Sequence, residues 1–116
     1  MGGCPPKGVE TRRERVTAIF RPQFWIDLED GVAYLAAKAS PETAKRWHGE
    51  VMAAVARVEK KPDLGRLRHD LKPTGIRSLV LRRFPRYVLF YRWESETGEI
   101  LRIKHGMMDI RNLFRS

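Results

Sequence analysis

Two apolar stripes separated by a very short break constrain the fold of this chain most strongly. The first stripe, spaced by four, four and three residues, consists of Phe24, Leu28, Val32 and Leu35. Ser40-Pro41-Glu42 follows with a capping hydroxyl, a first-turn proline and an acidic residue, which together predict the start of a second helix. The second stripe consists of Ala44, Trp47, Val51, Ala54, Val55 and Val58. Because the first helix should end near Lys38, the two helices must form an antiparallel hairpin.

Segments with strand character flank this helical hairpin on both sides. Residues 15–20 alternate like a short first strand, and further strands are predicted at 76–83, 86–93 and 99–105. The polar turn ESETG should join the last two strands into a hairpin. We therefore predict an α+β fold of order β-α-α-β-β-β, in which an antiparallel sheet packs on the helical hairpin and a short C-terminal helix follows.

Length and composition predict one soluble domain. With 116 residues, 42% of them hydrophobic and 32% charged, the chain suits a single domain over residues 15–116, preceded by a flexible leader at 1–14. No apolar run approaches the roughly 20 residues of a membrane span, so we expect a cytoplasmic protein without membrane contact. Cys4 stands alone and the histidines and carboxylates lack ligand spacing, so no metal and no cofactor are predicted.

Positive charge is concentrated in the second half of the chain. Residues 66–116 contain 12 Lys and Arg but five Asp and Glu, a net charge of +7 out of +9 for the whole chain. Such a bias favours an acidic or phosphate-bearing partner, although a basic surface without a specific ligand has the same composition. The stretch LRRFPRYVLFYRW, residues 81–93, places three of these arginines around a Phe-Pro break.

Several spaced motifs in this half resemble one bacterial protein family. They are Gly75-Ile76-Arg77, Phe84 and Tyr87 around the turn, Phe90-Tyr91-Arg92, and Ile100 to Ile103 followed by His105-Gly106 and Asp109-Ile110. In this order they resemble the RelE/ParE toxins of type II toxin–antitoxin modules, over about residues 15–114. One departure is Met108, which stands where many relatives of this subgroup carry an arginine.

The resemblance implies a toxin that a cognate antitoxin neutralises, and leaves its target open. ParE-like toxins poison DNA gyrase, whereas RelE-like toxins cut messenger RNA on the ribosome without a metal. Few lysines in 62–105 and no tyrosine in 106–116 favour the ParE-like alternative. A member of the fold that only binds a partner or nucleic acid is the third alternative. An acidic antitoxin segment is expected on the helical hairpin, near Trp25 and Trp47.

If the protein cuts RNA, the resemblance implies that His105 and Arg86 are the catalytic residues. They should lie at the same end of an antiparallel hairpin. Arg77, Arg82 and Arg83, together with Arg86, would bind phosphate or another part of the target. The structural alternatives are that His105, with the parity of Leu101 and Ile103, only packs on the core, and that the arginines protect a sheet edge.

Two further groups of side chains have a functional and a structural interpretation. Tyr87, Tyr91 and Trp93 share one strand face, where they would stack on RNA bases or, more commonly, pack against the helices. The acidic side chains in the first turns of the first helix are Asp27, Glu29 and Asp30. We expect these carboxylates to complement the helix dipole rather than to act as paired acids.

Overall fold

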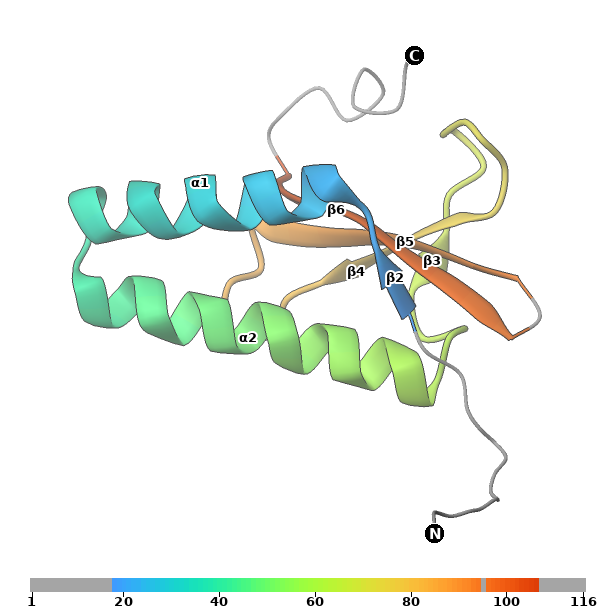
Figure 1. The fold of residues 1–116 in the computed structure, drawn as a ribbon, viewed down its shortest axis with the longest axis horizontal. Helices are drawn as coiled ribbons and strands as arrows, with labels where there is room; N and C mark the ends of the chain where they lie inside the picture. Colours follow the sequence, from blue (N-terminus) through green and yellow to red (C-terminus); the bar gives the residue numbers. More distant parts are fainter. Residues whose placement is uncertain (1–17, 95, 107–116) are drawn as a thin grey trace, which may run out of the picture.

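In the computed structural model, residues 18–94 and 96–106 are described, and they form two layers. A helical hairpin lies across one face of a five-stranded sheet (Figure 1). The elements are β2 (Ala18–Phe20), α1 (Pro22–Lys38), α2 (Pro41–Lys60), β3 (Arg66–Leu67), β4 (Ile76–Val80), β5 (Tyr87–Glu94) and β6 (Thr97–His105). The predicted α+β class and the order of the main elements are confirmed. The expected leader and C-terminal helix lie outside the described residues.

The break between the two helices is formed as the sequence predicts. The backbone amides of Ala39 and Ser40 both donate to the carbonyl of Leu35, at 2.8 and 3.0 Å, which ends α1. The hydroxyl of Ser40 accepts from the backbone amide of Thr43 at 3.0 Å, and Pro41 occupies the first turn of α2. A capping hydroxyl and a proline that lacks a donor leave fewer amides unsatisfied at the helix start. The chain therefore reverses within two residues.

The sheet is mixed, whereas an antiparallel sheet was expected. Its strand order is β2-β6-β5-β4-β3, and the neighbours from β3 to β6 are all antiparallel. β2 pairs with β6 in parallel, with Phe20 opposite Ile100. A parallel pair requires a crossover connection, and the helices and strands between β2 and β6 provide it. The sequence did not reveal this pairing, because a three-residue strand has no pattern that encodes its direction.

The connector between α2 and β4 is more ordered than its composition indicates. It contains the two-residue strand β3, which the sequence did not predict, and Leu71, which packs with Ile76 and Phe90 on the sheet face away from the helices. The hydroxyl of Tyr91 accepts from the amide of Gly65 at 2.8 Å and donates to the carbonyl of Pro62 at 2.6 Å. This hydroxyl therefore ties the start of the connector to the sheet.

The main core lies between the helices and the sheet. Its fully buried members include Phe24, Trp47, Val51, Leu89, Tyr91 and Ile100. Tyr87 and Trp93 pack against the same cluster while remaining partly accessible. The aromatic row of β5 is therefore mainly core packing, the more common of its two interpretations, although the ring of Tyr87 also lines a pocket.

A β-bulge in β6 changes which side chains share a face. Phe90 pairs with Arg102 and Tyr91 pairs with Ile100, so Leu101 is the extra residue between them. Leu101 packs with the Leu71 cluster on the face away from the helices, whereas Ile103 belongs to the main core. The expectation that Leu101 shares the parity of Ile103 and His105 is therefore wrong.

Asp27 is buried and bonded to the sheet, so its expected role at the helix dipole is wrong. Its side chain is 2% exposed and accepts from Nε of Arg102 at 2.7 Å and from Nζ of Lys104 at 3.3 Å. It also accepts from the backbone amide of Ile103 at 3.2 Å. Since β2 ends opposite Ile100, the carboxylate satisfies the edge of β6 where no strand continues.

Candidate functional site

The loop that joins β4 to β5 is short and closed by backbone hydrogen bonds. The amide of Leu81 donates to the carbonyl of Tyr87 at 3.1 Å, and the amide of Tyr87 donates to the carbonyl of Phe84 at 2.9 Å. Leu81 is buried, Phe84 is half-buried, and the remaining loop residues are exposed. Pro85 provides a fixed backbone angle at the turn. The loop therefore presents its arginines from a defined backbone rather than from a long connection.

Arg86 and His105 lie at the same end of the β5–β6 hairpin, as predicted. His105 is opposite Tyr87 in the strand register, and the amide of Gly106 donates to the carbonyl of Arg86. The rings of His105 and Tyr87 meet edge to face, with centroids 5.3 Å apart and an interplanar angle of 81°. His105 therefore packs on Tyr87, in agreement with the structural alternative, and also lines the pocket at this end of the sheet; its catalytic role stays a prediction.

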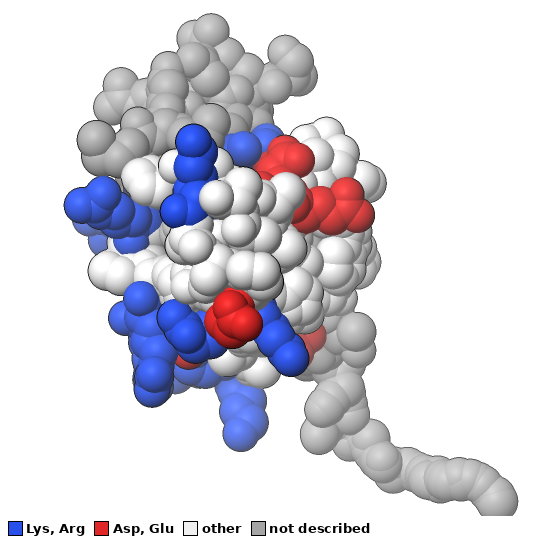
Figure 2. All heavy atoms as spheres, turned by 90° about the vertical axis from the view of Figure 1, so that its left-hand side faces the viewer, with Lys and Arg blue, Asp and Glu red and all other residues white. Residues whose placement is uncertain are grey.

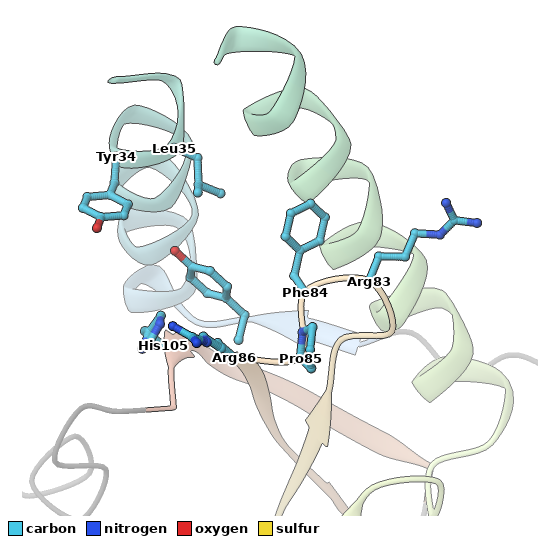
Figure 3. Close-up of a pocket in the computed structure, with 8 residues that line it drawn as sticks. Tyr34, Leu35, Arg83, Phe84, Pro85, Arg86 and His105 are labelled. Atoms are coloured by element: carbon cyan, nitrogen blue, oxygen red, sulfur yellow. The ribbon is translucent and has the colours of Figure 1, made fainter. Parts of the chain in front are cut away.

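This pocket has a volume of about 620 Å³ and is formed by α1, the β4–β5 loop and the β5–β6 hairpin (Figure 3). α1 contributes Tyr34 and Leu35, the β4–β5 loop contributes residues 83–86, and the ends of β5 and β6 contribute Tyr87 and His105. In Figure 3 Arg86 extends toward His105, whereas Arg83 points away toward α2. The arrangement combines an apolar cavity with a few converging polar groups, which is typical of a binding site.

The polar groups of the pocket are cations, an imidazole and phenols. Among the described residues, its lining contains neither a carboxylate nor a lysine. Burial, and secondarily the neighbouring phenol of Tyr34, raise the pKa of Tyr87 above its ordinary value. Since a base must lose its proton near neutral pH, the phenol of Tyr87 is a poor general base. The pocket is therefore better equipped to bind an anionic or aromatic group than to move protons.

The other arginines predicted for phosphate or target binding do not all join this pocket. Arg83 lines it, with a side chain that is 80% exposed and Nε 3.6 Å from the Glu50 carboxylate. Arg82 is exposed on the same loop but does not line the pocket. Arg77 lies on β4 and donates to the carbonyl of Gly65 at 2.8 Å. Its guanidinium is thus engaged in holding the connector.

The two tryptophans expected at an antitoxin surface have different positions. Trp25 is 44% exposed and lines a second hollow, of about 430 Å³, together with Val32 of α1 and His48 of α2. Trp47 is fully buried and meets Tyr87 edge to face at 5.1 Å. The ring of Trp47 is therefore part of the core, as its place in the apolar stripe of the second helix indicates, and it offers no surface to a partner.

Sequence reasoning missed four pocket residues as members of a site: Tyr34, Leu35, Phe84 and Pro85. Tyr34 is 56% exposed and lies one position before Leu35 of the apolar stripe. The sequence does give one indication of this position: Tyr34 is an aromatic residue beside the apolar stripe, near the end of a helix that must cover a sheet. Its proximity to Tyr87 nevertheless depends on how the helix crosses the sheet, which the sequence does not specify.

Basic side chains are prominent at this end of the molecule. Figure 2 shows the side on which α1 turns into α2, where Lys and Arg atoms cover much more of the surface than Asp and Glu atoms and flank a central uncharged area. An anionic partner would be attracted to such a surface before it makes contact.

The described residues contain neither a metal-binding cluster nor a membrane-spanning helix. Between residues 18 and 106, with residue 95 left out, no three His, Cys, Asp or Glu side chains are grouped so that they could hold a metal ion. Over the same part of the chain, neither helix is long and apolar enough to cross a membrane.

Comparisons with known proteins agree with the fold. The family model described as the ParE toxin of the type II toxin–antitoxin system parDE matches residues 18–110. A solved structure titled "Chromosomal ParDE TA system from P. aeruginosa" is similar, with 20% sequence identity and a TM-score of 0.65. The similarity covers 78% of this chain and 95% of the solved one. No match was found among curated protein sequences.

Proposed function

Since the chain belongs to the ParE toxin family of type II toxin–antitoxin systems, we propose that it inhibits growth by binding and poisoning DNA gyrase. The observation that carries this proposal is the match of the ParE family model over residues 18–110, because gyrase is the target that resemblance to this branch implies. The proposal needs a surface that binds a macromolecule, and it needs no reacting groups on the toxin.

The chemistry of the pocket supports the proposal. Metal-independent RNA cleavage requires a base for the 2′-hydroxyl, an acid for the leaving oxygen and cations for the phosphate. Among the described residues, the lining offers Arg83 and Arg86 as cations and His105 as a proton carrier, but neither a carboxylate nor a lysine. Burial raises the pKa of Tyr87, which disfavours its phenolate as the base, although the neutral phenol can still donate a proton. The described lining therefore offers little beyond His105 to act as the base.

A ribosome-dependent messenger endoribonuclease is the second candidate function. The specific observation in its favour is that His105 and Arg86, the two residues matched to cleaving relatives, line the same pocket. If this candidate is right, Arg86 stabilises the crowded phosphate and His105 transfers a proton, and replacing either residue abolishes cleavage.

We further propose that a cognate antitoxin neutralises the toxin and that the hollow beside Trp25 is one of its contacts. The hollow is largely apolar, lies between α1 and α2, and contains the exposed indole. A partner helix with apolar anchors would bury this surface, because helix-in-groove binding relies on such anchors. The expected partner is encoded by a small neighbouring reading frame with an acidic product.

Induction of the chain alone separates these candidates. We expect growth arrest with gyrase-dependent DNA breakage and SOS induction, and His105→Ala should retain this toxicity. Messenger cleavage in the ribosomal A site, lost in His105→Ala, would instead establish the ribonuclease. No arrest at all would favour a member of the fold that only binds a partner. Co-expression of the neighbouring acidic product should restore growth.

A further inference from the structure

The pocket at Arg86 adjoins a further hollow on the other side of the β4–β5 loop, which is distinct from the hollow beside Trp25. This hollow, of about 390 Å³, is lined by Arg46, Gly49 and Glu50 of α2 together with Arg83 and Phe84 of the loop. Because Arg83 and Phe84 also line the first pocket, the two hollows adjoin. We call the two together the loop groove. It leads from the end of β6, past Phe84, onto the exposed surface of α2.

The charges along the loop groove are unequal. Its described lining contains three arginines, at positions 46, 83 and 86, but one carboxylate, Glu50, which lies 3.6 Å from Arg83. Within the described residues, Arg46 and Arg86 have no carboxylate within ion-pair distance, and Arg46 contacts only the hydroxyl of Thr43, at 3.4 Å. The two guanidiniums are therefore available at opposite ends of the groove to carboxylates of a partner.

The shape of the groove suits an extended chain with one large apolar side chain. At the Arg86 end, Leu35, Phe84 and Pro85 form apolar walls of a cavity large enough for an aromatic or leucine side chain. At the other end, Gly49 lies in the middle of α2, and a Cβ atom added there would meet nothing within 4 Å. Mid-helix glycine is unfavourable relative to alanine, and here it lets another backbone approach α2 closely.

From the groove's continuity, charge and shape, we propose that an extended acidic segment of the antitoxin lies along the loop groove. One large apolar side chain of the segment occupies the Arg86 pocket, and carboxylates on either side of it meet Arg86 and Arg46. This inference rests on the proposed function, since it requires a protein antitoxin. The segment would thus make a second contact besides the Trp25 hollow. This contact crosses the β4–β5 loop and covers the basic end of the toxin.

Dissociation kinetics of the toxin–antitoxin complex test the electrostatic part of the inference. With the immobilised neighbouring acidic protein as the probe, Arg86→Gln and Arg46→Gln should each increase the dissociation rate about tenfold, because direct partners of a charge act on dissociation. Arg82→Gln is the matched control, since Arg82 is an exposed arginine of the same loop outside the groove. It should change the dissociation rate less than twofold.

A pair of bulky substitutions on α2 tests the path of the segment. Gly49→Trp fills the groove and should weaken binding at least tenfold, whereas Ala56→Trp, two turns later on the exposed surface of the same helix, should change it less than twofold. Both sites are exposed, so circular dichroism should show folded proteins for both variants.

The possible outcomes separate this inference from the proposed function. A tight complex whose dissociation is unaffected by Arg46→Gln, Arg86→Gln and Gly49→Trp overturns the loop groove as the antitoxin site and leaves the toxin assignment intact. Loss of gyrase poisoning in these variants, with unchanged antitoxin kinetics, likewise overturns it and makes the groove a target surface. If the neighbouring product neither binds nor restores growth, the antitoxin proposal fails and this inference fails with it.

Discussion

Two polar clusters at neighbouring places in the molecule differ in how completely their groups are satisfied. Around Asp27, one carboxylate accepts from a guanidinium, an ammonium and a backbone amide while its side chain is 2% exposed. Around Arg86, an arginine, an imidazole and two phenols converge on an open cavity. The hydrogen bonds of the first cluster hold α1 to β6, whereas in the second the guanidinium of Arg86 has no carboxylate within ion-pair distance among the described residues and faces an open cavity. Both clusters are charged. They differ in whether the charged group is already hydrogen-bonded within the protein, as Asp27 is, or faces an open cavity, as Arg86 does.

The largest effect is expected from breaking the closed cluster. Asp27→Ala leaves two cations and the amide of Ile103 without their acceptor, so it should lower the free energy of unfolding by about 3 kcal/mol. Urea denaturation measures this loss. Asp30→Ala, an exposed acidic position on the same helix, is the control and should stay within about 0.5 kcal/mol of the parent. Equal effects at both positions would contradict a special role for Asp27.

A second closed interaction, the bridge formed by the Tyr91 hydroxyl, should have a smaller effect. Tyr91→Phe removes an acceptor for Gly65 and a donor for Pro62, and the expected loss in the free energy of unfolding is about 2 kcal/mol. Tyr34→Phe changes an exposed phenol of the open pocket and should alter stability by less than about 0.5 kcal/mol. A stability change in Tyr34→Phe as large as that in Tyr91→Phe would remove the distinction between the clusters.

Alkaline pH should weaken the folded state through the same phenols. Burial raises the pKa of Tyr87 and of Tyr91 in the folded protein, so the folded state binds these protons more tightly than the unfolded state. Their contribution is complete below the ordinary phenol pKa of about 10 and is lost as pH rises through the raised folded values. Denaturation at several pH values between about 9 and 11 should show this decline. Tyr91→Phe should reduce its slope, and an unchanged slope would exclude Tyr91 as a source.

The smallest effect on stability is expected at the centre of the open cluster. Arg86→Ala should change the free energy of unfolding by less than about 0.5 kcal/mol, because its side chain is exposed. The same substitution should clearly reduce growth inhibition in cells that express the chain. A variant that is fully toxic and fully stable would show that Arg86 contributes neither to stability nor to target binding, and would leave the antitoxin as its partner.

Patterns within short stretches of the sequence, such as capping residues and apolar spacing, predicted the helices and strands of this fold and the position of part of its site. The Ser40-Pro41 start, the apolar stripes and the hairpin turn are encoded within a few residues of each other, so they were read correctly. The proximity of Arg86 and His105 followed from antiparallel pairing alone. Asp27 and Trp47 were misassigned because their roles depend on contacts with residues far away in the chain, for example 75 residues between Asp27 and Arg102. Tyr34 entered the pocket through helix packing, which periodicity does not specify.

The bulge at Leu101 has a consequence for the site that concerns chain length rather than chemistry. Side chains alternate between the faces of a strand, so one surplus residue inverts the direction of every side chain that follows it. If β6 accommodated Leu101 in a regular ladder instead of a bulge, His105 would point to the face that carries Leu71, and Lys104 would point toward Tyr87 and the helices. Deletion of Leu101 would instead leave Ile100 opposite Tyr91 and His105 opposite Tyr87 in a regular ladder, so the imidazole would stay at the wall of the pocket. The bulge therefore lets β6 carry one additional residue without changing this wall.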